Sequence, residues 1–146
     1  MLVIGSDHGG LTLKTALTGY LKRRGFEVTD AGTYDDSSVD YPDFAQKVAD
    51  SLIAGDAELG ILVCGTGIGM SIAANKIPGI RAALVTDLFM ARMAKEHNNA
   101  NVLVLGGRIL DEQNACDLVG AWLDARFEGG RHQIRLDKIA ALEKKY

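Results

Sequence analysis

Hydrophobic residues along the chain gather in short runs, and longer amphipathic segments separate these runs. Valine, isoleucine and leucine dominate most of the runs, which is typical of buried β-strands. The runs occupy residues 2–4, 26–29, 61–64, 80–85 and 101–105. Between them, apolar residues recur three or four positions apart, as Leu13, Leu17 and Leu21 do in the first segment. The pattern predicts five strands that alternate with helices.

Residues that favour helix ends place the helices between these strands. Gly25 and Gly55 end the first two expected helices, and Pro42 opens the second. A short helix to about Lys76 follows the third strand, and Thr86 or Asp87 can cap the helix after the fourth. The last two expected helices run from Asp111 to the Gly129-Gly130 pair and from Gln133 to Lys144.

Strands joined by helices imply right-handed crossovers and a parallel sheet that helices cover on both faces. The sequence therefore predicts an α/β fold, a three-layer α/β/α sandwich around a Rossmann-like, five-stranded parallel sheet. Its 146 residues, of which 47% are hydrophobic, fit a single domain over residues 1–146.

The net charge and the cysteine content limit which partners and which cellular compartment are expected. The formal net charge is −3 and no long block of like charges occurs, so neither nucleic acid nor a membrane surface is expected as the main partner. No apolar run approaches the ~20 residues that span a bilayer. Cys64 and Cys116 form no CxxC pair, and no secretory leader precedes the first strand. We therefore expect a soluble protein of the reducing cytoplasm.

The stretch from Ile61 to Lys76 is the strongest candidate for chemistry. Its strand ends in Cys64, and alternating glycines at 65, 67 and 69 lead into a helix. Glycines allow a ligand to approach the backbone closely, and the first amides of a helix lack internal acceptors, so the turn suits an anion or oxyanion and favours a thiolate at Cys64. Such turns also occur for structural reasons, and free cysteine commonly packs in cores, as we expect for Cys116.

Polar residues that follow the other strands belong to the same predicted edge of the sheet. These are Asp7, His8, Tyr41, Asp87 and Arg108. His97 and Asn98 precede the fifth strand and therefore lie at the opposite edge, where they are either structural or serve a neighbouring subunit. Arg131 and Arg135 stand four residues apart on one helix face, spaced either to hold a dianion such as phosphate or simply to face solvent.

Three familiar sites do not fit the glycine-rich stretch. A dinucleotide fingerprint needs glycine where Met70 stands, and a Walker loop needs a lysine that Met70-Ser71 does not supply. A thiol phosphatase would close its cysteine loop with an arginine, and none lies between Cys64 and Lys76. The loop is therefore better suited to an oxyanion that is not a nucleotide phosphate.

Several motifs together resemble the type B ribose-5-phosphate isomerases, in the ribose/galactose isomerase family. They cover the chain from the first strand to the last helix, and the most specific are the run from Cys64 to Lys76 and the run Glu128-Gly129-Gly130-Arg131-His132. The others are Ser6-Asp7-His8-Gly9-Gly10, Asp40-Tyr41-Pro42, Gly79-Ile80-Arg81-Ala82, His97-Asn98, Asn101-Val102-Leu103 and Gly107-Arg108.

The resemblance implies an aldose-ketose isomerase that passes through a cis-enediolate and needs neither metal nor cofactor. Cys64 would be the base, Thr66 would move a proton at the sugar oxygen, and His97 would assist ring opening. A branch that uses a glutamate base has it at position 70, where this chain has Met70. The substrate-binding positions would be Asp7, His8, Tyr41, Gly65, Gly67, Ile68, Gly69, Asn98, Arg108, Arg131 and Arg135, with the three arginines gripping the phosphate.

The resemblance also implies a homodimer whose active sites are shared between subunits, with possible pairing of dimers. His97, Asn98 and the late arginines would complete the partner's site, and the C-terminal helix would pack on the partner. Two other functions stay open at this point. One is a hexose-6-phosphate isomerase for allose or galactose 6-phosphate on the same scaffold, and the other is a binding module for sugar phosphates without catalysis.

Overall fold

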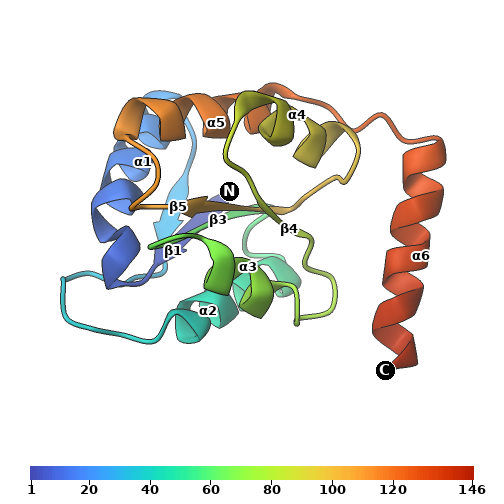
Figure 1. The fold of residues 1–146 in the computed structure, drawn as a ribbon, viewed down its shortest axis with the longest axis horizontal. Helices are drawn as coiled ribbons and strands as arrows, with labels where there is room; N and C mark the ends of the chain where they lie inside the picture. Colours follow the sequence, from blue (N-terminus) through green and yellow to red (C-terminus); the bar gives the residue numbers. More distant parts are fainter.

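A five-stranded parallel sheet forms the centre of the computed structural model, which describes residues 1–146 (Figure 1). The strand order is β2-β1-β3-β5-β4, and every pair of neighbours is parallel. The strands are β1 (Leu2–Ser6), β2 (Val28–Asp30), β3 (Leu59–Cys64), β4 (Ala82–Leu84) and β5 (Val102–Gly106). The predicted fold is thereby confirmed.

Helices cover both faces of this sheet. Helices α1 (Leu11–Arg23), α4 (Leu88–Glu96) and α5 (Glu112–Asp124) pack on one face, and α2 (Tyr41–Ile53) and α3 (Ile68–Ala74) pack on the other. A short 3₁₀ turn (His8–Gly10) precedes α1. Each face has its own apolar cluster, and the sheet separates the two. Burial of both clusters is the main stabilising contribution expected for a sandwich of this kind.

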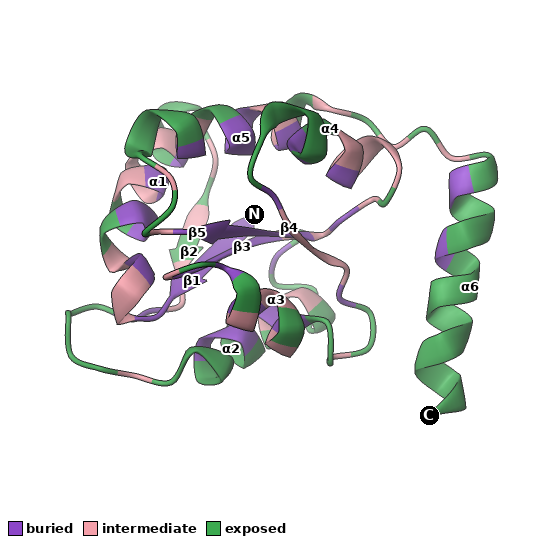
Figure 2. Ribbon diagram, in the orientation of Figure 1, coloured by how far each residue is buried: buried purple, intermediate pink, exposed green.

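The central strands β1 and β5 are buried along their whole length and β3 in all but its first residue, whereas the short edge strands are half-buried or exposed (Figure 2). The register places Ser6 beside Val63 and Cys64 beside Gly106. The carboxyl ends of β1, β3 and β5 therefore meet at one edge of the sheet. Chain segments that leave these strands all begin at that edge, where ligands bind in open α/β sheets.

Helix α5 is shorter than predicted. It ends at Asp124, and Ala125 adopts an extended backbone with ψ of 159°, so Phe127 lies in a linker and not on the helix. The last apolar contacts of the helix with the core come from Trp122 and Leu123, and the Glu128 amide donates to the Glu96 carbonyl at 3.0 Å. The hydrogen bond to the end of α4 therefore stabilises the linker more than another helical turn would, because that turn would have no contact with the core.

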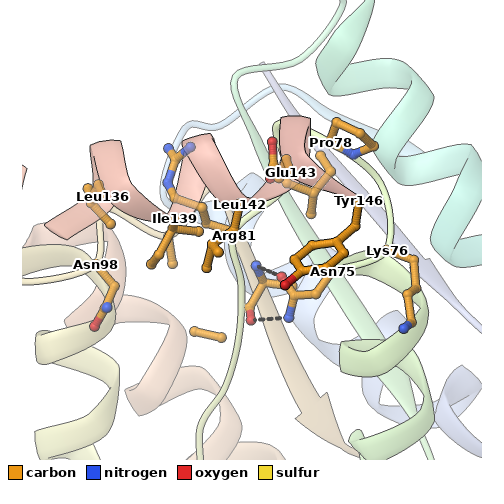
Figure 3. Close-up of a pocket in the computed structure, with 14 residues that line it drawn as sticks. Asn75, Lys76, Pro78, Arg81, Asn98, Leu136, Ile139, Leu142, Glu143 and Tyr146 are labelled. Atoms are coloured by element: carbon orange, nitrogen blue, oxygen red, sulfur yellow. Dashed lines mark hydrogen bonds between the residues drawn. The ribbon is translucent and has the colours of Figure 1, made fainter.

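Helix α6 (Arg131–Lys145) stands apart from the sandwich, and most of its surface is exposed (Figures 1 and 2). Only His132 and Leu136 are buried on it. Near its C-terminus the Glu143 carboxylate accepts a hydrogen bond from the Gly79 amide at 3.1 Å. A groove of about 790 Å³ lies between α6 and the sandwich, and Figure 3 shows Leu136, Ile139 and Leu142 of α6 among the side chains that line it.

None of the helices combines the length and the apolar character needed to cross a membrane.

Candidate active site

Cys64 ends β3 at the carboxyl edge of the sheet, with only 5% of the residue exposed. Its Sγ accepts a hydrogen bond from the Gly67 amide at 3.2 Å. The turn that makes this possible requires Gly67 to adopt a left-handed backbone, with φ of 83°. The Gly67 amide therefore points at the sulfur, where it can donate to negative charge that develops during a reaction.

Thr66 is exposed beside this thiol at the start of α3. Its Oγ1 accepts from the Ile68 amide at 3.2 Å, which leaves its own hydroxyl hydrogen free to donate. The Gly67 and Ile68 amides are thus engaged within the turn. The amides of Gly65, Thr66 and Gly69 are left for a ligand, so fewer donors are available than the glycine pattern alone predicts.

The 3₁₀ turn after β1 brings Asp7 and His8 to the same edge. Asp7 is buried, and its Oδ1 caps the turn by accepting from the Gly10 amide at 3.1 Å. His8 accepts from the Val39 amide through Nδ1 at 3.2 Å, so the neutral ring carries its proton on Nε2. This hydrogen bond orients His8 as a donor from its free nitrogen.

Tyr41 and Arg108 complete this first group of predicted residues. The Tyr41 ring lies so close to α3 that a Cβ atom on Gly69 would be 2.5 Å from its Cζ. The Arg108 guanidinium lies over the cysteine turn, because a Cβ on Gly65 would be 3.2 Å from its Nη1. The Arg108 amide also donates to the Gly65 carbonyl at 2.9 Å. An absent Cβ at both glycines is what allows these side chains to approach.

A second group of predicted residues lies at the other end of the sheet. His97 caps the C-terminus of α4, Asn98 follows it, and Arg131 and Arg135 are exposed on the first turns of α6. The five residues of β5 separate this end from Cys64, which corresponds to about 13 Å along the strand. One chain therefore does not bring His97 to its own Cys64. Arg108 lies with the first group and Arg131 with Arg135 in the second, so a single chain does not gather the three arginines on one phosphate.

Two residues without a predicted role, Glu128 and His132, join His97. The rings of His97 and His132 stack with centroids 4.0 Å apart and planes inclined by 15°. The Glu128 Oε1 lies 3.6 Å from His97 Nε2 and 3.4 Å from His132 Nε2. Burial lowers the pKa of His132 below its ordinary value of 6.5, and the neighbouring His97 and Arg131 charges lower it further. His132 is therefore neutral at pH 7.

These three side chains place potential metal-ligand atoms within 4.8 Å of one another. Two features oppose a metal ion at this cluster. Stacked imidazole rings direct their nitrogen lone pairs side by side, whereas ligands of one ion must converge. Arg131 and Arg135 also act on His132 with positive charge, which opposes a cation, whereas the Glu128 carboxylate acts in the opposite sense. The two exposed arginines are the part of the second group that suits an anion.

Comparisons with known proteins agree with this geometry. A family model described as Ribose/Galactose Isomerase matches residues 2–139. Ribose-5-phosphate isomerase B of Escherichia coli is 44% identical over 144 residues, which cover 99% of this chain and 97% of that protein.

Solved structures show the same relationship. The structure of Clostridium thermocellum ribose-5-phosphate isomerase B is 55% identical, with a TM-score of 0.98 over 99% of this chain and 98% of that one. A Mycoplasma genitalium ribose-5-phosphate isomerase B with bound ribulose-5-phosphate is 48% identical, with a TM-score of 0.94 over 99% of this chain and 97% of that one.

Together with the α/β fold, these matches define the protein as a sugar isomerase. In particular, the chain belongs to the ribose/galactose isomerase family. The predicted resemblance and the predicted enzyme class are both confirmed.

Proposed function

We propose that the protein interconverts ribose 5-phosphate and ribulose 5-phosphate. Family membership and the Mycoplasma relative with bound ribulose-5-phosphate support this substrate. The observation that carries the chemistry is the Cys64 thiol, whose Sγ accepts a hydrogen bond from the Gly67 amide in the same turn that holds the exposed Thr66.

The reaction moves one proton from C2 to C1 of the open-chain sugar and another from O2 to O1. In our proposal the Cys64 thiolate removes the C2 proton and returns it to C1. The amides of Gly65, Thr66 and Gly69 stabilise the negative oxygen of the cis-enediolate between these steps, and the Thr66 hydroxyl relays the proton between the oxygens. No step requires a metal ion or a cofactor.

Ribose 5-phosphate is mainly a furanose, so the ring must open before isomerisation. We assign His97 to this step, with Asn98 beside it, while Asp7, His8 and Tyr41 contact the sugar hydroxyls. His97 lies at the wrong end of the sheet to act on its own Cys64, and we therefore propose a homodimer in which each subunit supplies His97, Arg131 and Arg135 to the other. The Arg108 of one chain and the late arginines of the partner would then share the phosphate.

Exposed apolar side chains support this dimer. Monomeric proteins rarely expose a large contiguous apolar patch. Here four large hydrophobic residues that are more than half exposed follow the carboxyl ends of β3, β4 and β5: Ile68, Ile72, Phe89 and Ile109. Each lies in a segment that leaves the carboxyl edge of the sheet, the edge where Cys64 lies, so a partner that covers this edge would also reach the site. Helix α6, with Ile134 and Leu142 exposed, is the element we place against the partner.

The test of the proposed function is an isomerase assay in heavy water with the wild type and the Cys64→Ala variant. We expect wild-type turnover of ribose 5-phosphate with deuterium entering at the exchanged carbon, and loss of turnover in Cys64→Ala by at least about 10²-fold, since a positioned base contributes that much. Binding of the phosphate should be largely retained in the variant. Full activity in Cys64→Ala would exclude the thiol as base.

The same assay separates the other two functions. Comparing kcat/KM for ribose 5-phosphate with kcat/KM for allose and galactose 6-phosphate tests the hexose alternative, and a preference for either hexose would refute the pentose assignment. A sugar-phosphate binding module would bind ligand but would introduce no deuterium into recovered substrate.

A further inference from the structure

Glu128 has no role in the proposed chemistry, yet it is the carboxylate closest to His97. It lies in the linker between α5 and α6, and its backbone amide donates to the Glu96 carbonyl at 3.0 Å. Glu96 immediately precedes His97 at the end of α4. The backbone that carries Glu128 is therefore held beside the backbone that carries His97, which keeps the two side chains within reach of each other.

The carboxylate lies against both rings, of which only His97 is open to solvent. Glu128 Oε1 lies within ion-pair distance of Nε2 on both rings, at 3.6 and 3.4 Å. His132 is buried, its Nε2 has no hydrogen-bond partner, and burial holds its pKa low, so it stays neutral. His97 is 37% exposed and faces solvent or substrate. His97 is therefore the ring of the pair that a substrate can reach, and Glu128 lies where it can orient that ring.

We infer that Glu128 is a positioning residue for His97, which it orients together with the stacked ring of His132. With Nε2 directed at Glu128, Nδ1 is the nitrogen that can face a sugar. Protonated His97 would then give its Nδ1 proton to the furanose ring oxygen as the bond between C1 and that oxygen breaks. The anomeric hydroxyl loses its proton to water as the aldehyde forms, and His97 regains a proton from solvent. Contacts of this kind are often long in unliganded enzymes and shorten when substrate binds.

The inference rests on the proposed function, in which His97 opens the ring. It predicts a selective defect, because ribulose 5-phosphate carries its phosphate on the C5 oxygen and cannot close a furanose ring. Exchange of its C1 hydrogen with solvent deuterium needs Cys64 but no ring opening. Turnover of ribose 5-phosphate needs both.

The experiment measures these two rates in Glu128→Gln, which preserves the size of the side chain and the backbone tie to Glu96. We expect kcat for ribose 5-phosphate to fall by about tenfold or more, with KM little changed and C1 exchange in ribulose 5-phosphate within about twofold of wild type. Glu128→Asp, which keeps the carboxylate, should recover part of the loss. Glu96→Gln removes the same charge one residue from His97 and should leave both rates unchanged.

His97→Asn in the same assays distinguishes failure of the inference from failure of the proposed function. If His97→Asn lowers ribose 5-phosphate turnover selectively and Glu128→Gln does not, Glu128 has no positioning role. If His97→Asn spares both rates, the ring-opening role of His97 is itself wrong. The double variant should be no slower than His97→Asn alone, because Glu128 acts only through His97. Equal loss of both rates in Glu128→Gln would indicate a general structural effect and overturn the inference.

Discussion

At the scale of single residues, Gly67 sets the geometry of the turn around the Cys64 thiol. Its backbone has φ of 83°, and its amide is the donor to Cys64 Sγ. A Cβ atom there would also lie 2.5 Å from Leu84 Cδ1 and 3.2 Å from the Leu105 carbonyl carbon. Gly55 has nearly the same φ, 80°, but no atom lies within 4 Å of the place of its Cβ. An alanine at Gly55 would therefore suffer backbone strain alone, whereas an alanine at Gly67 would suffer backbone strain and a steric clash.

We predict that Gly55→Ala lowers the free energy of unfolding by about 1 kcal/mol, the cost of a left-handed alanine. Gly67→Ala should lower it by about 2 kcal/mol more, because the added methyl group must displace Leu84. Only Gly67→Ala should also lower isomerase activity, since it moves the donor to Cys64. Urea denaturation and initial rates on both variants test this, and equal losses of stability would contradict the steric argument.

The sequence identified most first-group residues but missed Glu128 and His132. Cys64, Gly67 and Arg108 follow buried strands, so a parallel sheet places them at one edge. Glu128 meets His97 only because the linker after α5 is attached to the end of α4, and this contact has no periodicity in the sequence. The family resemblance includes these two positions in the run Glu128-Gly129-Gly130-Arg131-His132. It does not indicate that either side chain contacts His97.

At the scale of elements, the strands and helices follow the hydrophobic pattern wherever that pattern meets the core. The α5 helix was predicted too long because two glycines at 129 and 130 look like a helix end, whereas the apolar contacts stop near Trp122. Strand β4 was predicted over residues 80–85 and covers only Ala82–Leu84, because an edge strand pairs on one side alone. The position of α6 relative to the sandwich could not be predicted, since it depends on two buried residues, His132 and Leu136, and on the hydrogen bond between Gly79 and Glu143.

One of these two residues makes the attachment of α6 sensitive to pH. The pKa of His132 is lowered in the folded protein, mainly by burial, so below its ordinary value of 6.5 the unfolded chain binds more protons than the folded one. Stability is therefore expected to fall as the pH drops from about 7 to about 5.5. In His132→Gln this dependence should be flatter.

The measurement is urea denaturation of wild type and His132→Gln between about pH 8 and about pH 5.5. The difference at the alkaline end reports lost packing, because His132 is neutral there in both states. The change in this difference in unfolding free energy toward acid pH reports the contribution of proton binding at His132. Parallel pH profiles for the two proteins would show that His132 contributes nothing to acid destabilisation.

At the scale of the whole molecule, the two groups of functional residues lie at opposite ends of one sheet. If each active site combines Cys64 from one subunit with His97 from the other, two inactive variants can complement each other. A heterodimer of Cys64→Ala and His97→Asn chains has one site with both lesions and one intact site. Random pairing makes half of the dimers heterodimers, so the mixture should regain about a quarter of wild-type turnover of ribose 5-phosphate.

This complementation is tested by co-expressing the two variants, or by mixing them under conditions that allow subunits to exchange. The variants kept separate provide the baseline, and a mixture of Cys64→Ala with Cys64→Ala/His97→Asn, which can form no intact site, controls for effects of mixing. Activity no higher than the average of the separate variants would show that each site lies within one chain.

If the proposed shared site is correct, the separation of Cys64 from His97 along β5 also makes catalysis depend on protein concentration. A lone subunit would then hold parts of two different sites and no complete one, so specific activity would measure subunit association. On dilution below the dissociation constant of the dimer, turnover per chain should decline in proportion to the fraction of chains that are paired. In that arrangement saturating sugar phosphate would contact both subunits, so it should stabilise the dimer and shift the decline to lower protein concentration.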